Sequence, residues 1–197
     1  MKPKVYVEGG GDSSLDRECR EGFSKLFEKL GLRVQFVACG PRDQAFKRFR
    51  NAALKSDGTW PILLVDSEEV VVLPTKKEHL TNRDTNWQFP ENVTERQVQL
   101  MTTCTESWLV CDRNALKDYF GQCFKEGSLP STHNIEEKDH HEVIEALKVA
   151  TRDCGKDKSY DKGQHSFKVL ARLDPQKLIG LTYFDEAFKA IKGHTQT

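Results

Sequence analysis

Three short apolar runs alternate with two helix-like segments at the start of the chain, and this order restricts the possible folds. The apolar runs are residues 4–8, residues 33–40 (RVQFVACG) and residues 60–68 (WPILLVDSE). Residues 15–30 and 41–55 between them carry apolar side chains at helical spacing. Strand, helix, strand, helix and strand in this order predict an α/β fold with a mainly parallel sheet flanked by helices.

Local signals mark the ends of the two predicted helices. Ser13 and Asp16 are placed for a capping box, and Gly31 is placed to stop the first helix. Pro41 suits the first position of the second helix. The third apolar run is continuous, which is typical of a strand that is covered on both faces.

The rest of the chain gives weaker signals. Residues 74–97 form a polar, turn-rich connector of a length that is usually functional or mobile. Residues 98–112 (VQLMTTCTESWLVCD) indicate a further apolar strand with Glu106 inside it. Helices are expected at residues 114–120, 140–152 and 183–192. We expect an α/β core over residues 1–125 and a mostly helical extension over residues 126–197, packed together as one domain.

Composition limits the class of protein. Hydrophobic residues make up 37% of the 197 residues and charged residues 30%, which predicts a globular protein. No apolar run approaches the ~20 residues of a membrane span, and the N-terminus lacks a signal-peptide pattern. We therefore expect a cytoplasmic protein without a membrane partner. The formal net charge is zero, so contact with nucleic acid requires a local basic patch.

The six cysteines are scattered and contain no CxxC pair, which argues against a structural zinc site and a thioredoxin-type motif. We expect most of them to be reduced core residues. They are Cys19, Cys39, Cys104, Cys111, Cys123 and Cys154.

Carboxylates follow two of the predicted strands. Glu8 ends the first strand, and Asp66 and Glu68 end the third. Ligands of parallel α/β sheets bind at the carboxyl ends of the strands, so these side chains are expected to meet at one mouth. Magnesium and manganese prefer such oxygen ligands, and the three acids therefore predict a metal site.

The glycine-rich turn after the first strand does not match the usual phosphate-binding motifs. Gly9, Gly11 and Ser14 miss the third glycine of the dinucleotide fingerprint, and Glu8 would repel a pyrophosphate. The chain has no GxxxxGK[ST] sequence and hence no P-loop. If an ATPase drives its activity, that ATPase is another protein.

Several blocks of the chain resemble the Toprim domain of topoisomerases, primases and the overcoming-lysogenization-defect nucleases. The blocks are VEGGGDSSLDRECREGF, LLVDSE, MTTCTESWLVCDRNAL and YDKGQHSFKVLARLDP. They are most similar to a small prokaryotic Toprim-like family that is often found beside ATPase genes in defence operons. The usual Asp-x-Asp pair is Asp66-Ser67-Glu68 here, and the longer second side chain could shift a metal or leave room for only one.

The resemblance implies specific roles for the site residues. It implies that Asp66 and Glu68 bind magnesium or manganese and that Glu8 is a general acid/base or a further ligand. Lys162 would meet the scissile phosphate, since a lysine can stabilise charge on its oxygens. Residues with secondary expected roles are Asp12 and Glu106 as ligands and His165 in proton transfer.

Structural roles remain open for the same residues. Glu8 could cap the first helix or pair with Arg42, and Asp12 could be a turn or cap residue. Glu106 must be satisfied by partners or lie at the site, because an unpaired buried carboxylate is costly. A histidine in a polar turn, such as His165, is more often solvated or capping. The strand-end acids could also be ordinary loop residues.

Two further patterns are weaker. Arg42, Lys47, Arg48 and Arg50 could follow a nucleic-acid backbone, but their interleaving with phenylalanines is also typical of an amphipathic surface helix. His141 and Glu145 have zinc-ligand spacing without a third ligand, which favours a solvated helix face.

Three functions compete on this basis. The first is a metal-dependent nuclease acting on DNA or RNA, working with an ATPase partner in prokaryotic defence. The second is a non-catalytic interaction module of such a complex. The third is a phosphotransferase or phosphatase on a small nucleotide, which would need a closed pocket with a stacking aromatic such as Trp87 or Trp108. An oligomer is compatible with all three.

Overall fold

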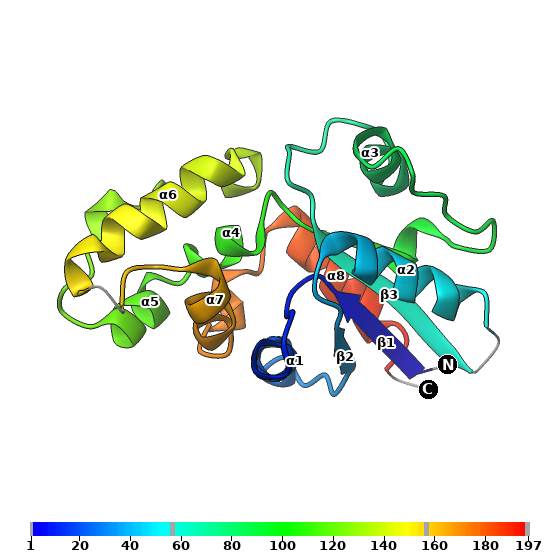
Figure 1. Ribbon diagram of the computed structural model, residues 1–197, viewed down its shortest axis with the longest axis horizontal. Coiled ribbons are helices and arrows are strands. Elements are labelled where there is room, and N and C mark those ends of the chain that lie inside the picture. The colour runs from blue at the N-terminus through cyan, green and yellow to red at the C-terminus, as the bar shows by residue number, and fades with distance from the viewer. Residues whose placement is uncertain (1, 56–57, 156–157, 196–197) are drawn as a thin grey trace.

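The chain forms a four-stranded, all-parallel sheet flanked by helices (Figure 1). The structure is a computed structural model, which describes residues 2–55, 58–155 and 158–195. The strand order is β2-β1-β3-β4. The strands are β1 (Lys2–Val7), β2 (Gln35–Ala38), β3 (Thr59–Asp66) and β4 (Val98–Met101). The α/β fold with a parallel sheet, predicted from the order of strand and helix signals, is therefore confirmed.

Eight α-helices and five short 3₁₀ helices lie in the described residues. The α-helices are α1 (Ser13–Glu28), α2 (Arg42–Ala53), α3 (Lys76–Arg83), α4 (Thr105–Leu109), α5 (Arg113–Phe120), α6 (His140–Thr151), α7 (Lys162–Leu170) and α8 (Thr182–Lys192). The 3₁₀ helices are Glu95–Gln97, Glu126–Ser128, Ile135–Glu137, Arg152–Cys154 and Pro175–Lys177. Helices α4 to α7 gather on one side of the molecule, away from α2 and α3 (Figure 1).

The register of the central strands fixes where their ends lie. Val7 of β1 pairs with Leu64 of β3, and Asp66 of β3 pairs with Met101 of β4. Beyond the last β1 residue, the Glu8 N–H donates to the Leu64 carbonyl at 3.1 Å. The parallel direction of all pairs places the carboxyl ends of β1 and β3 side by side at one edge of the sheet.

Two hydrophobic clusters cover the sheet, because successive strand residues point to opposite faces. One cluster contains Ile62 and Leu64 of β3 with Phe23 and Phe27 of α1. The other contains Leu63 and Val65 of β3 with residues of α2 and α3. Burial of β3 on both faces explains its continuous apolar sequence.

The C-terminal part of the chain shares the first of these clusters. Phe184 of α8 packs against Phe27 of α1, with ring centroids 6.0 Å apart, and against Trp108 of α4 at 5.1 Å. Helix α8 also contacts β4. Residues 126–197, which contain helices and no strand in their described part, therefore complete the core of the sheet rather than forming a separate one.

The structure corrects the expected strand at residues 98–112. Strand β4 ends at Met101, and Glu106 lies in helix α4. The apolar run continues through both elements because both are buried, so hydrophobicity alone did not show the change from strand to helix.

Other helix boundaries also differ from the predictions. The N-cap of α1 is Asp12, whose carboxylate accepts from the backbone N–H groups of Ser14 and Leu15 at 2.8 and 2.9 Å, so the capping box at Ser13 is wrong. Pro41 precedes α2 as its N-cap. Helix α3 lies inside the expected connector, where Thr75 and Glu78 form a capping box.

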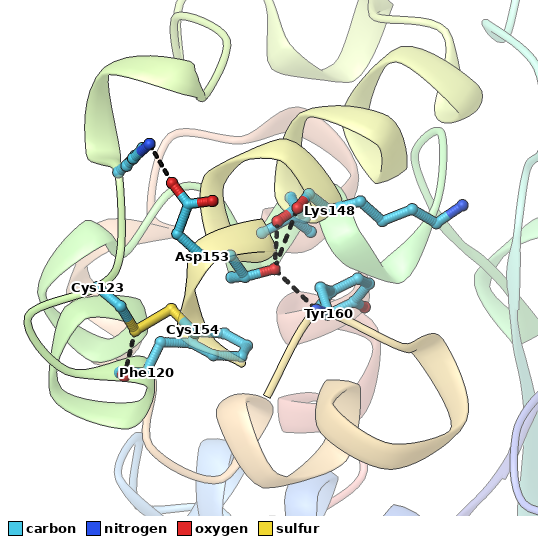
Figure 2. Close-up of a disulfide and its surroundings, with 9 residues drawn as sticks. Phe120, Cys123, Lys148, Asp153, Cys154 and Tyr160 are labelled. Atoms are coloured by element: carbon cyan, nitrogen blue, oxygen red, sulfur yellow. Dashed lines mark hydrogen bonds and ion pairs between the residues drawn. A yellow bond between two sulfur atoms is a disulfide. The ribbon is translucent and has the colours of Figure 1, made fainter. Parts of the chain in front are cut away.

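One cysteine pair forms a disulfide. Cys123, which follows α5, is bonded to Cys154, which follows α6 (Figure 2). The other four cysteines are free, which confirms the expectation that most of the cysteines are reduced, although the sequence did not reveal the bonded pair. No helix in the described ranges is long and apolar enough to cross a membrane.

We predict that replacing both bonded cysteines (Cys123→Ala with Cys154→Ala) lowers the free energy of unfolding by about 2–4 kcal/mol, because the crosslink restricts the unfolded chain across a sequence separation of 31 residues. Urea denaturation followed by tryptophan fluorescence measures this difference. A dithiol reductant should lower the stability of the wild type to that of the double variant and leave the variant unchanged. Equal stability of the oxidised wild type and the variant would contradict a stabilising role for the bond.

Candidate metal centre

Three carboxylates converge at the carboxyl end of the sheet. Glu8 follows β1, Asp66 ends β3 and Glu68 lies two residues further. One carboxylate oxygen from each lies within 4.8 Å of the others. No other group of three acidic, histidine or cysteine side chains comes this close together within the described ranges. The structure thus brings together the three residues that the sequence selected as metal ligands.

The backbone around β3 holds these side chains in place. The Asp66 N–H donates to Oε2 of Glu8 at 3.3 Å, which ties the two strand ends together. Glu68 has a φ of 66°, in the left-handed region that non-glycine residues rarely adopt. Its N–H donates to the Thr103 carbonyl at 2.7 Å. This local strain turns the chain directly after the strand and keeps Glu68 near the other two acids.

Asp66 is the buried centre of the group, and both of its carboxylate oxygens have protein partners. Oδ1 accepts from the backbone N–H and from the hydroxyl of Thr105, each at 2.8 Å. Oδ2 accepts from Nζ of Lys162, also at 2.8 Å. Thr105 belongs to α4 and Lys162 to α7. Helices α4 and α7 therefore supply the hydrogen-bond donors and the positive charge that stabilise the Asp66 carboxylate.

Lys162 connects two buried acids. Its Nζ lies 2.8 Å from Asp66 and 3.4 Å from Oε2 of Glu106, while 49% of its side chain stays exposed. Burial acts to lower the pKa of Lys162, but the carboxylates of Asp66 and Glu106 outweigh it and raise this pKa above its ordinary value. The ammonium therefore remains charged at neutral pH. The resemblance singled out this lysine, and the structure places it at the acidic cluster.

Glu106 lies behind Lys162 and is completely buried. Its Oε1 accepts from the Tyr160 hydroxyl at 2.6 Å and from the Ser166 hydroxyl at 3.4 Å. Its Oε2 has no hydrogen bond to any residue that the structure describes and lies 3.4 Å from Nζ of Lys162. Glu106 is therefore satisfied by partners and orients Lys162, and it lies outside the group of three potential ligands.

Arg42 supplies the second cation of the cluster. Its Nη1 lies 3.7 Å from Oε2 of Glu8 and donates to the Asp66 carbonyl. Its Nε donates to Asp84 at 3.0 Å. The pairing of Glu8 with Arg42, which the sequence left open, therefore occurs, and Arg42 is engaged inside the protein instead of facing a nucleic-acid backbone. Lys47, Arg48 and Arg50 are exposed on α2, and their role at a backbone stays a prediction.

The charge balance of the cluster is unfavourable for Glu8. Burial raises its pKa from 4.5 to about 8, the Asp66 carboxylate adds to this, and Arg42 and Lys162 oppose it. Burial is the main cause, and the Arg42 and Lys162 cations do not restore the ordinary pKa of Glu8. An additional cation would lower the free energy of the ionised cluster, so the set of hard oxygen donors fits magnesium or manganese.

His140 is a neighbour of the cluster that the sequence did not reveal. Its Nε2 lies 3.5 Å from Oε2 of Glu68, and its buried Nδ1 has no hydrogen-bond partner among the described residues. The pair considered for zinc was His141 and Glu145, but His141 is exposed and Glu145 pairs with Lys148 at 2.6 Å. Only the folding of α6 toward the end of β3 brings His140 close, so spacing along the chain carried no signal.

The other proposed site residues have structural roles. Asp12 caps α1, as the sequence allowed, and is exposed outside the group of three. His165 is not in a solvated turn, because α7 buries it and its Nδ1 contacts the Tyr119 hydroxyl at 3.0 Å. Burial also lowers the pKa of His165.

The glycines after β1 allow close packing around a cavity of about 330 Å³ that opens onto the cluster. A Cβ at Gly9 would lie 2.5 Å from the Phe167 ring, and the Gly11 N–H donates to the Asp16 carboxylate at 3.0 Å. The cavity is lined by residues that include Glu8, Gly9, Gly10, Gly11, Asp66, Thr105, Lys162 and Phe167. Gly9 and Gly10 thus leave room for Phe167 of α7 and Asp16 of α1.

Neither expected stacking aromatic lines this cavity. Trp108 is completely buried in the core. Trp87 stacks on Phe46 at 4.2 Å and donates from Nε1 to Asp43 at 2.9 Å. The small-nucleotide phosphotransferase or phosphatase, for which Trp87 and Trp108 were the named examples of a stacking aromatic, therefore gains nothing from these two rings, and Phe167 is the aromatic residue in the cavity lining.

Comparison with known proteins places the chain in a family without revealing a function. The family model described as "Domain of unknown function (DUF4276)" matches residues 7–189. No curated protein matches the chain, and no solved structure matches it. The matched region contains all the residues of the cluster.

We predict that Glu8→Gln stabilises the metal-free protein at alkaline pH. Because the pKa of Glu8 is about 8 in the folded protein and ordinary in the unfolded chain, its ionisation costs stability as pH rises from about 4.5 to 8. The variant should resemble the wild type near pH 5 and be more stable near pH 9 by about 1–3 kcal/mol. Urea denaturation with a chelator present at both pH values measures this difference.

Glu91→Gln is the control, since Glu91 is exposed and should change stability by less than about 0.5 kcal/mol at either pH. A Glu8→Gln variant that is less stable than the wild type at pH 9, or equally shifted at both pH values, would show that Glu8 is not held in a repulsive environment.

Proposed function

We propose that this chain, which belongs to the DUF4276 family, is a metal-dependent nuclease of Toprim type that hydrolyses phosphodiester bonds in DNA or RNA. The observation that carries the proposal is the convergence of Glu8, Asp66 and Glu68 within 4.8 Å at the carboxyl end of a parallel sheet. A lysine and an open cavity adjoin this cluster. Together they provide the charges that phosphodiester hydrolysis requires.

The acids would hold magnesium or manganese through Asp66, Glu68 and Glu8. Such an ion, when bound, polarises the phosphate and lowers the pKa of coordinated water. Asp66 is the most buried of the three and is oriented by Thr105. Glu8 and Glu68 are partly exposed, and Glu8 also lines the cavity. The site would therefore have one buried carboxylate ligand, Asp66, and two partly exposed carboxylate ligands.

Lys162 would bind the scissile phosphate. It lines the cavity beside Asp66, and its raised pKa keeps it positively charged. Glu106, fixed by Tyr160, holds its ammonium in position from behind. Glu8 is placed to accept a proton from an attacking water or to act as a further ligand. His140 would position Glu68 through their contact at 3.5 Å.

The biological setting follows from the resemblance. The Toprim-like family that the chain resembles lies beside ATPase genes in prokaryotic defence operons, and the sequence has no P-loop of its own. We therefore extend the proposal to a cytoplasmic defence effector that works with a separate ATPase. The resemblance alone supports this setting, while the parallel sheet with acids at its strand ends supports the proposed chemistry.

A second function is favoured by one specific observation. Thr105 and Lys162 occupy both carboxylate oxygens of Asp66, so this residue is satisfied by the protein alone. A site of this kind suits a non-catalytic interaction module in which the acids and cations stabilise the fold or bind a regulatory ion. The two functions differ in whether the cluster supports cleavage.

We predict that the purified protein cleaves plasmid and single-stranded nucleic acid with magnesium or manganese and that a chelator stops the cleavage. Glu8→Gln and Asp66→Asn should each lower the cleavage rate by at least about 100-fold, because the first removes the proton acceptor or further ligand and the second removes a metal ligand. Gel electrophoresis of timed samples gives the rates.

Glu69→Gln is the matched control, because Glu69 is an exposed neighbour of Glu68 that pairs with Arg83 instead of the cluster. This variant should cleave at the wild-type rate. Cleavage that survives both Glu8→Gln and Asp66→Asn would move the active site elsewhere. Absence of cleavage with every metal, nucleic acid and ATPase partner tested would favour the interaction module.

A further inference from the structure

A second cavity shares Phe167 of α7 with the cavity at the metal centre. Its volume is about 350 Å³. Its lining comes from α1, α5, α7 and the residues that follow α7: Arg17, Glu18, Glu21, Gly22, Lys25, Tyr119, Phe167, Lys168, Ala171 and Arg172. We call it the α1–α7 groove. None of its charged residues belongs to the acidic cluster.

The α1–α7 groove has a surplus of positive charge. Lys25 pairs with Glu21, and Lys168 pairs with Glu18 at 3.5 Å, which neutralises both acids of the lining. In the part of the chain that the structure describes, the remaining two cations, Arg17 and Arg172, form no ion pair. Guanidinium groups present several N–H donors in a planar fork, which matches the oxygens of a phosphate.

An aromatic ring lies beside these arginines. The Arg172 guanidinium is 5.2 Å from the centroid of the Tyr119 ring. The Tyr119 hydroxyl contacts Nδ1 of the buried His165 at 3.0 Å, which fixes the orientation of the ring. Tyr119 is partly exposed. Stacking of nucleobases on such a ring is how many proteins bind single strands without sequence preference.

Phe167 links the groove to the metal centre. Its side chain lines both cavities, and its ring packs against Gly9 in the turn that carries Glu8 into the site. A polymer with one phosphate beside Lys162 could therefore place a neighbouring nucleotide in the groove. A small ligand would occupy only one of the two cavities.

We propose that the α1–α7 groove binds a single-stranded segment of nucleic acid and leads it to the metal centre. The proposal rests on the proposed nuclease function, because it takes the metal centre as the place to which the bound strand leads. Arg17 and Arg172 bind backbone phosphates, and Tyr119 stacks a base. The volume of the cavity lies at the small end of ligand sites, which suits on the order of one nucleotide and not a duplex.

The test is fluorescence anisotropy with a labelled oligothymidylate of about 16 nucleotides. A chelator is present, so binding is measured without cleavage. The double variant Arg17→Ala/Arg172→Ala should bind at least about 10-fold more weakly than the wild type. The slope of log affinity against log salt concentration should fall by about 1.4, or roughly 0.7 for each lost phosphate contact.

The double variant Arg20→Ala/Arg33→Ala is the control for charge. Both residues are exposed and lie outside the groove, and their loss changes the net charge by the same amount. This variant should bind within about 3-fold of the wild type, because neither guanidinium lines the groove and exposed charges are screened by salt. Equal weakening in the two double variants would show that net charge alone governs binding and would overturn the assignment to the groove.

Tyr119 gives a test that does not depend on charge. Tyr119→Phe loses the hydroxyl contact with His165 but keeps the ring, and it should bind within about 3-fold of the wild type, while Tyr119→Leu should bind about 5-fold or more weakly because a stacking surface is lost. Urea denaturation of both variants confirms that they fold. Equal binding by Tyr119→Leu and the wild type, or tighter binding of a duplex of the same length, would overturn the single-strand assignment.

The outcome is separable from that of the nuclease proposal. Binding that depends on Arg17 and Arg172 in a protein that never cleaves supports the groove and contradicts the nuclease. Metal-dependent cleavage, together with binding that does not change when Arg17 and Arg172 are replaced, supports the nuclease and overturns the groove. No binding by the wild type at low salt also overturns the groove.

Discussion

Parallel pairing of β1 with β3 is the constraint on which the site depends. The pairing of Val7 with Leu64 places Glu8 next to the end of β3, where Asp66 and Glu68 follow. Burial and the nearby Asp66 carboxylate both raise the pKa of Glu8, because each disfavours its ionised form. The fold tolerates the cluster because Arg42 and Lys162 bring positive charge to it. The three carboxylates still outnumber these two cations, and such an acidic site is suited to binding a further cation.

The C-terminal helices are part of the site and do not merely cover the core. Helix α4 supplies the Thr105 donors to Asp66, and α7 supplies Lys162. The Glu106 carboxylate connects these helices through Lys162 and Tyr160. The Tyr160 N–H in turn donates to the Thr151 hydroxyl at 2.7 Å, close to the disulfide (Figure 2). Segments distant in sequence thus fix one lysine against one aspartate.

The sequence predicted the local features that follow from periodicity and missed those that depend on tertiary contact. Alternating strands and helices predicted the parallel sheet, and acids at strand ends predicted Glu8, Asp66 and Glu68. Lys162 came from the resemblance and not from spacing. Helix α4 was mistaken for strand because a buried apolar run has no clear period. The contacts of His140 and Thr105 join distant segments, so no local pattern could reveal them.

The most direct test of the central claim is calorimetric titration of manganese into the chelator-treated protein near neutral pH. We predict that the wild type and Glu69→Gln bind the ion with the same affinity, because Glu69 lies outside the group of three. Asp66→Asn should bind at least about 10-fold more weakly, since a buried carboxylate ligand is lost. Equal affinity of Asp66→Asn and the wild type, or no binding by either, would contradict a metal centre at the strand ends.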